Sequence, residues 1–180
     1  MKELKLIIGL FFVIINLTVF GQAIENNDLD RWGALTEENY SINYPDDWEL
    51  NQSGIMGTSF ILFSPISSEK DQFRENVNLL IQNLTGLNLD LNKYVEISVD
   101  QIRTILTDGK IITNERITTE NLDYQKAIYT GKQGIFDLTF EQYYWVVGDN
   151  AFVLTLTCET GEFDNYQTVG EKILNSFNIK

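Results

Sequence analysis

Histidine is absent from this 180-residue sequence, cysteine occurs once, and proline occurs twice. Without histidine the chain cannot use Ser-His-Asp or Cys-His catalysis, and it lacks the ligand of most zinc sites. The single cysteine, Cys158, cannot form an intramolecular disulfide, so packing must stabilise the fold even in an oxidising compartment. Cys158 lies in an apolar, strand-like segment, which favours a buried, inert thiol over a nucleophile. The sequence also has no G-x-G-x-x-G motif, phosphate-binding loop or C-x-x-C pair.

Basic residues are scarce too. Lysine and arginine together number 13 against 26 acidic residues, and the formal net charge is −13. A surface of this sign repels phosphate backbones and anionic membranes, so a nucleic acid partner is not expected. It could attract a basic partner or divalent cations, although acidity often serves solubility alone. With this many acids, carboxylate pairs are unavoidable, and they give little support to a glycosidase-type hydrolase.

Residues 1–23 have the pattern of a secretory signal peptide. Two lysines precede the apolar run Leu6–Phe20, and small residues follow at Gly21 and Ala23, where cleavage is plausible. The run is about 15 residues long, shorter than the ~20 residues of a membrane-spanning helix. No cysteine lies near the cleavage region to accept a lipid. We therefore expect export to a bacterial periplasm or secretion, with no stable membrane span after cleavage.

The rest of the chain is predicted to form a polar acidic leader, residues 24–39, and one folded domain, residues 40–180. A hydrophobic content of 43% supports a packed domain. The leader is expected to be a tether or a short helix. It contains alternating residues that resemble the first ligands of a calcium loop: Asn26, Asp28 and Asp30. Arg31 stands where such a loop requires glycine, so a solvated leader is the preferred interpretation.

Two segments have the period of a helix. In Leu91–Leu106 apolar residues recur every three or four positions, and Asp90 is a candidate N-cap. In Asn165–Phe177 the apolar stripe follows Asp164, and Gln167 completes the pattern of a capping box.

Other apolar segments have the pattern of strands: Ser41–Tyr44, Trp48–Leu50, Ser59–Ser64, Asn76–Leu84, Lys110–Ile117, Leu122–Thr130, Ile135–Val147 and Ala151–Cys158. Short links between neighbouring strands favour antiparallel pairing, and the order of strands and helices predicts an α+β fold. The last two segments are apolar on both faces, which indicates a central hairpin covered on both sides. Two helices could cover a largely antiparallel sheet of about six strands.

In order and spacing, these pieces resemble the PsbP-like family, which includes the photosystem II extrinsic protein, the Ran-binding Mog-type factor and DcrB-type envelope proteins. The pieces that match are Tyr40-Ser-Ile-Asn-Tyr-Pro-Asp-Asp-Trp48, Ser59-Phe-Ile-Leu-Phe-Ser-Pro65, Asn76-Val-Asn-Leu-Leu-Ile-Gln82, the Leu91–Leu106 helix, Ala151-Phe-Val-Leu-Thr-Leu-Thr157, Phe163-Asp-Asn-Tyr166 and Ile173-Leu-Asn-Ser-Phe177. The resemblance covers residues 38–180.

The resemblance implies a three-layer α/β/α sandwich around an antiparallel sheet, and a non-catalytic binding or assembly role. It transfers no functional residue to this chain. The plant extrinsic proteins have a functional N-terminal extension, whereas only the short segment 24–39 precedes the domain here. A photosystem role is therefore not expected. The glutamine and alanine after the apolar run resemble a bacterial signal and not a plastid transit peptide, so a bacterial exported member is expected.

Two groups of residues are candidates for partner binding. Asp46, Asp47 and Trp48 could form a partner-facing corner, or the acids could serve a turn while Trp48 packs in the core. Tyr143 and Trp145 could line an interface or an apolar cleft. Packing is the preferred interpretation for both groups, because acids commonly occupy turns and aromatic residues at strand spacing commonly fill cores.

We therefore predict an exported, non-catalytic module without a cofactor that engages another envelope or secreted protein. Such a module is expected to expose an apolar or aromatic patch at a sheet edge or a helix face. The alternative is a periplasmic carrier of a small apolar ligand or of a divalent cation such as calcium or manganese, which needs an enclosed pocket or converging carboxylates. A carboxylate-based hydrolase is the third, least favoured possibility. The sequence leaves the partner and the oligomeric state open.

Overall fold

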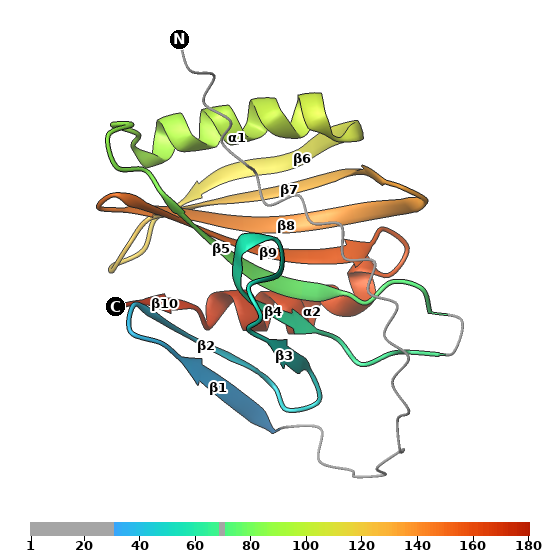
Figure 1. The fold of residues 1–180 in the computed structure, drawn as a ribbon. Coiled ribbons are helices and arrows are strands. Elements are labelled where there is room, and N and C mark those ends of the chain that lie inside the picture. Colours follow the sequence, from blue (N-terminus) through green and yellow to red (C-terminus); the bar gives the residue numbers. More distant parts are fainter. Residues whose placement is uncertain (1–30, 69–70) are drawn as a thin grey trace.

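The computed structural model describes residues 31–68 and 71–180, which form two antiparallel sheets and two α-helices (Figure 1). The larger sheet consists, in spatial order, of β3 (Glu49–Asn51), β4 (Thr58–Phe63), β5 (Asn76–Asn83), β9 (Asn150–Glu159), β8 (Phe136–Val147), β7 (Tyr124–Gln133) and β6 (Thr107–Ile117). The smaller sheet consists of β1 (Trp32–Thr36), β2 (Tyr40–Pro45) and β10 (Asn178–Ile179). The predicted signal peptide and most of the leader lie outside the described residues.

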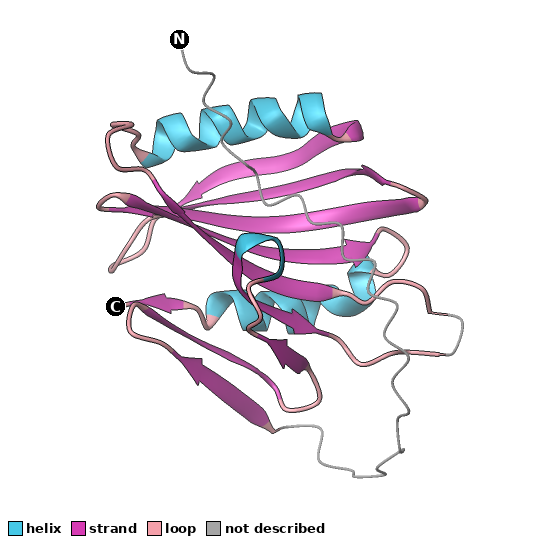
Figure 2. Ribbon diagram, viewed as in Figure 1, coloured by secondary structure: helices cyan, strands magenta, loops and turns pink. Residues whose placement is uncertain are grey.

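The large sheet is the middle of three layers. Helix α1 (Leu91–Ile105) covers one face, while α2 (Phe163–Asn175) and the small sheet cover the other (Figure 2). Leu80 and Val153 face each other across β5 and β9 and belong to the core beneath α1, whereas Leu79 and Leu154 belong to the core beneath α2. The predicted three-layer sandwich is confirmed, with a sheet of seven strands instead of about six.

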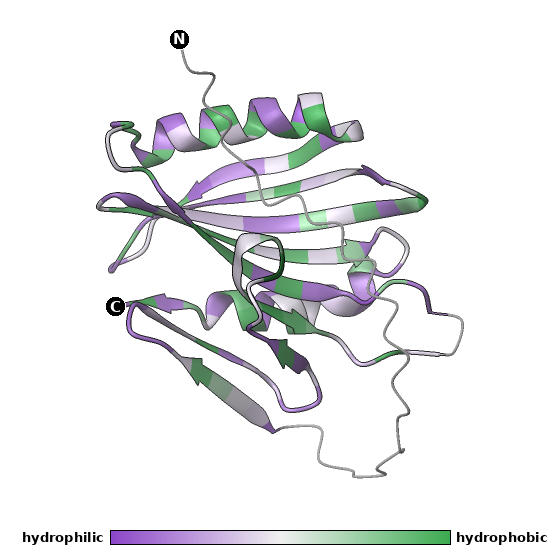
Figure 3. Ribbon diagram, in the orientation of Figure 1, coloured by the Kyte–Doolittle hydropathy of each residue, from purple (hydrophilic) through white to green (hydrophobic). Residues whose placement is uncertain are grey.

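Helix α1 begins and ends close to where the sequence predicts. The carboxylate of Asp90 accepts a hydrogen bond from the backbone N–H of Lys93 at 2.8 Å, as an N-cap does. The helix is amphipathic, and Figure 3 shows both hydrophilic and hydrophobic residues along α1. Gly109, near the start of β6, lies so close to the end of α1 that a Cβ atom there would be 2.6 Å from the carbonyl oxygen of Ile102. Only glycine fits this close approach.

Helix α2 begins at Phe163, earlier than predicted, and the predicted capping box does not form. Glu162 is the N-cap residue, its side chain caps no backbone N–H group, and Asp164 lies inside the first turn. The carboxylate of Glu162 instead accepts a hydrogen bond from the side-chain amide of Asn165 at 2.8 Å. Phe163 is buried in the core beneath α2, and its burial extends the helix toward the N-terminus.

The end of the predicted leader is a strand, not a tether or a short helix. Strand β1 pairs with β2, and Trp32 lies opposite Pro45. Leu35 is only 8% exposed and packs in the core beneath α2, and the partly buried Trp32 packs against the same core, so both residues anchor the strand. The other edge of β2 pairs with residues 178–179 at the C-terminus, a strand that the sequence does not predict. The two ends of the described chain therefore meet in one small sheet.

Candidate functional site

The aromatic residues predicted as partner-binding candidates lie inside the molecule. Trp48, Tyr143 and Trp145 are 5%, 2% and 6% exposed, and all three belong to the core beneath α2. The ring of Trp48 meets the ring of Tyr166 edge-on at 6.4 Å, and the ring of Trp145 lies 5.3 Å from that of Phe177. These contacts agree with the packing interpretation.

The two aspartates of the same prediction lie apart from the rings, on the surface. Asp46 and Asp47 are exposed in the turn between β2 and β3, and the backbone N–H of Trp48 donates to the carbonyl of Pro45 at 2.9 Å to close it. Both aspartates therefore occupy a turn, as the alternative interpretation expects. A contact between these aspartates and a partner stays a prediction. Asn26, Asp28 and Asp30, the candidate calcium ligands, lie outside the described residues.

A buried charge cluster joins the sheet to α2. The ammonium group of Lys126 on β7 lies 2.8 Å from Glu141 on β8 and 3.0 Å from Glu171 on α2. The Glu141 side chain is completely buried, and Lys126 forms its ion pair. Lys126 also lies 5.7 Å from the centre of the Tyr143 ring. One lysine therefore ties together two strands and a helix.

Burial and charge act in opposite directions on this cluster. Burial raises the pKa of Glu141, and the nearby Lys126 ammonium partly offsets that rise. Burial on its own lowers the pKa of Lys126, but the carboxylates of Glu141 and Glu171 outweigh it, so the lysine pKa is raised. Glu141 has no exposed surface, so its carboxylate links the layers and is closed to solvent.

Sequence reasoning missed this cluster. Its one visible signal is a glutamate inside an otherwise apolar strand, since Glu141 interrupts the run from Leu138 to Val147. An isolated charge in a central strand needs a partner, because burying an unpaired charge is costly. The identity of that partner depends on the tertiary contact between β7, β8 and α2.

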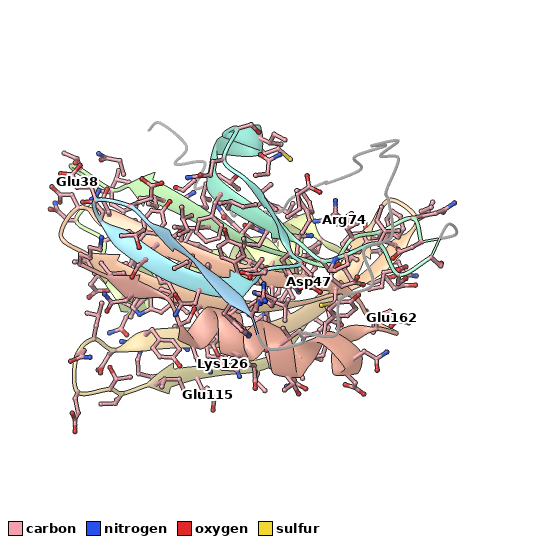
Figure 4. The ribbon with its side chains drawn as sticks, turned by 90° about the horizontal axis from the view of Figure 1, so that it is seen from below. Glu38, Asp47, Arg74, Glu115, Lys126 and Glu162 are labelled. Atoms are coloured by element: carbon pink, nitrogen blue, oxygen red, sulfur yellow. The ribbon has the colours of Figure 1, made fainter. Side chains whose placement is uncertain are left out.

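Four carboxylates gather where the link from β4 to β5 meets the start of α2, and we call Asp71, Glu75, Glu159 and Glu162 the acidic corner. Glu75 is 2% exposed, and the hydroxyl of Ser64 lies 3.5 Å from its carboxylate. Figure 4 places Glu162 and Arg74, the neighbour of Glu75, toward the same end of the molecule.

Electrostatics raises the pKa of two members of the acidic corner. Burial raises the pKa of Glu75, backbone hydrogen bonds partly offset the rise, and the charges of Asp71 and Glu159 add to it. Burial also raises the pKa of Glu159, and repulsion from Asp71 and Glu162 raises it further. These acids repel one another in the free protein, so a cation placed among them would be attracted.

The carrier alternative needs an enclosed pocket or a metal cluster. In residues 31–68 and 71–180, no group of three or more acidic or cysteine side chains could hold a metal ion. Two hollows of about 430 Å³ and 480 Å³ open to solvent, one between the start of α1 and the β8–β9 turn, the other around Lys132. In the second, Lys132 lies 3.4 Å from Asp108 and 3.8 Å from Asp137. Neither hollow is the enclosed apolar cavity that a lipid carrier would have.

Cys158, the other residue of chemical interest, is buried beneath α2. Burial raises its thiol pKa, and nearby glutamates raise it further, so the thiolate form is disfavoured. The prediction of a buried, unreactive cysteine agrees with this environment.

By sequence the chain matches no family model and no curated protein. Solved structures, in contrast, resemble it over most of its length. CyanoP, the cyanobacterial PsbP of Synechocystis sp. PCC 6803, has a TM-score of 0.63 at 10% identity, covering 88% of this chain and 98% of its own. The chain has a PsbP-like fold.

Two further structures show the same PsbP-like fold. LpqN of Mycobacterium tuberculosis, involved in cell envelope biogenesis, has a TM-score of 0.62 at 15% identity, covering 83% of this chain and 91% of its own. PA94 of Pseudomonas aeruginosa, a protein of unknown function, has a TM-score of 0.58 at 13% identity, covering 81% and 94%. The likeness confirms the fold that the Tyr40–Trp48 segment and the later pieces suggest. Neither helix of the described residues has the length and apolar character to cross a membrane.

Proposed function

We propose that this chain is an exported, non-catalytic module that binds a basic surface of another envelope or secreted protein. The observation that carries the proposal is the acidic corner, where burial and mutual repulsion raise the pKa of Glu75 and Glu159. A basic side chain of a partner would relieve this repulsion, and attraction between opposite charges would also speed the encounter.

The fold and the signal pattern support the same proposal. LpqN, whose PsbP-like fold this chain shares, is involved in cell envelope biogenesis, and residues 1–23 of this chain predict export. The acidic corner is accessible in part, since Glu162 is exposed and Glu159 is half-buried. A partner could therefore reach its carboxylates without unfolding the domain.

The test is affinity capture from the native envelope after mild cross-linking, with the exported chain as bait. We expect a reproducible protein partner whose recovery falls at least tenfold with E159Q/E162Q. The matched control is E96Q/D100N, which removes the same charge from the exposed face of α1 and should leave recovery unchanged. No partner at all, or equal losses with both double variants, would contradict the proposal.

The carrier function has weaker support in the described residues, since both hollows are open. A thermal-shift screen against calcium, manganese and lipids tests it directly. A melting midpoint that stays constant across the screen removes this alternative.

A further inference from the structure

Strand β6 is the last strand of the large sheet, and its outer edge has no neighbouring strand among the described residues. The strand is 11 residues long, and most of its side chains are exposed, including Ile112 at 53%. Exposed sheet edges are normally short or covered, because their unpaired N–H and C=O groups can pair with another strand. A long free edge is therefore a place where a second strand can add.

A bulge in β6 sets which side chains share a face. Ile111 lies opposite Tyr129, but Thr113 lies opposite the adjacent Ile128, so Ile112 is an extra residue in the strand. Residues five apart lie on opposite faces of a regular strand, because side chains alternate. The extra residue brings Lys110 and Glu115, which are five apart, onto the same face, the one covered by α2.

We propose that β6 is a self-association surface on which the β6 strand of a second copy of this chain pairs antiparallel, around a two-fold axis at Thr113. In this register the extra residue, Ile112, stays unpaired in both copies, so three positions on one side of Thr113 match two on the other. Lys110 of each copy then lies opposite Glu115 of the other, and the two oppositely charged pairs stabilise the contact. Ile111 lies opposite Asn114 of the second copy, on the face toward α1. The two sheets become one continuous sheet, and the inference extends beyond the proposed partner binding.

Several two-fold symmetric registers of two β6 strands are possible. They differ in which charged side chains lie opposite each other and in which face of the sheet the side chains share. Moving the two-fold axis by one position along the strand places Lys110 opposite an uncharged residue, and moving it to Glu115 brings two glutamates together. A shift between the copies that breaks the two-fold symmetry by one residue would turn every side chain to the wrong face. Only the axis at Thr113 pairs Lys110 with Glu115 in both directions.

Both charges are free for this contact. Within residues 31–68 and 71–180, neither Lys110 nor Glu115 forms an ion pair, and both are exposed. Glu115 lies opposite Lys126 in the register of β6 and β7, but the ammonium group of Lys126 contacts Glu141 and Glu171 instead. Charged residues and bulges normally prevent an edge strand from pairing with other strands. In β6 the bulge at Ile112 and the charges of Lys110 and Glu115 still allow one register, in which two copies of the strand are complementary to each other.

The dimer is expected to be weak. The edge of a single strand buries far less than the ~1,600 Å² of a standard interface, and the net charge of −13 opposes the approach of two copies. Sedimentation equilibrium over a wide range of concentrations, at physiological salt, measures such an association.

Charge reversal tests the register. K110E places two glutamates opposite each other, and E115K places two lysines opposite each other, so each single variant should raise the dimer Kd about tenfold. The double variant K110E/E115K restores both pairs in reversed order and should restore the wild-type Kd. The two single changes shift the net charge in opposite directions, so a common weakening cannot come from net charge.

The control is K93E on α1, which changes the net charge as K110E does, at an exposed site whose ammonium group pairs with Glu96 of the same helix. It should change Kd less than twofold. A wild-type chain that remains monomeric at its highest soluble concentration overturns the proposal. A double variant as weak as the single variants, or a K93E variant as weak as K110E, overturns it as well.

Discussion

Lys126 connects the sheet to α2 through two ion pairs. Its ammonium group lies within 3.0 Å of two carboxylates, and one of these, Glu141, has no exposed surface. A buried ion pair adds little net stability, because desolvation offsets the attraction between its charges. Removing one member is costly, because the other charge is then buried without a partner.

We predict that K126M lowers the free energy of unfolding at pH 7 by about 3–5 kcal/mol. K126M/E141Q should recover most of the loss, because no charge then remains buried at Glu141. Urea denaturation of the three proteins measures the difference. K132M is the control, since Lys132 is half-exposed and its ion pairs should contribute only about 0–1 kcal/mol. Equal losses with K126M and K132M would contradict the buried-charge account.

Glu75 predicts a pH dependence of stability. Burial raises its folded-state pKa above the ordinary value of 4.5, so the folded protein holds this proton more tightly than the unfolded chain does. Its contribution is fully present below the unfolded pKa and is lost as pH rises through the raised folded pKa. E75Q should therefore gain stability relative to wild type between pH 4.5 and pH 7.

Urea midpoints at a series of pH values test this prediction, with E96Q on the exposed face of α1 as the control. A difference between E75Q and wild type that is constant with pH would contradict it.

Among the buried charged residues, the sequence indicates only that a glutamate such as Glu141 is unusual in an apolar strand. Which lysine meets it, and which acids surround Glu75, depends on segments far apart in the chain.

At the scale of elements, α2 packs closely on β9 at Gly170. A Cβ atom on Gly170 would lie 2.4 Å from one methyl carbon of Leu156 and 2.9 Å from the other. Leu156 is completely buried, so its side chain has little room to move. The glycine lets the helix lie flat against the sheet.

We predict that G170A destabilises the protein by about 1–3 kcal/mol through overpacking. In an exposed helix the same change from glycine to alanine would instead stabilise the protein by about 1 kcal/mol. A loss of stability in G170A would therefore indicate that Gly170 packs closely against Leu156. G161A is the matched control, because a Cβ atom at Gly161 meets nothing within 4 Å. Thermal unfolding of both variants measures the effect, and a stabilised G170A would show that α2 is not held against Leu156.

The elements themselves differ in how far the sequence predicts them. The Asp90 cap and the apolar stripe of α1 are local patterns, so the helix follows from them. The start of α2 was wrong by two residues, because burial of Phe163 outweighs the local capping pattern that begins at Asp164. Strand β1 was missed, since its one buried anchor, Leu35, has no pattern of alternating apolar neighbours.

At the scale of the whole molecule, the small sheet connects the start of the described chain to its end. Strand β2 lies between β1 and β10, and the backbone N–H of Lys180 donates to the carbonyl of Asn39 at 3.0 Å. The small sheet also covers the core beneath α2, to which Leu35 and Ile42 both contribute.

We predict that a chain beginning at Glu37 is less stable than one beginning at Arg31, by about 2 kcal/mol or more. The loss comes from the buried side chain of Leu35, which contributes roughly 1.5–3 kcal/mol, and from the paired backbone of β1. Chemical denaturation of the two chains gives the difference. Equal stabilities would mean that β1 adds nothing to the domain and that the leader ends where the sequence predicts.

The sequence by itself determined the fold class, the two helices and the strong acidity, because periodicity, capping residues and charge are local properties. It also excluded histidine chemistry and an intramolecular disulfide. The tertiary structure decided which residues are available for binding. It buried Trp48, Tyr143 and Trp145, gathered the acidic corner, and left β6 with a free edge, because burial and strand order depend on contacts between segments that are distant in the chain.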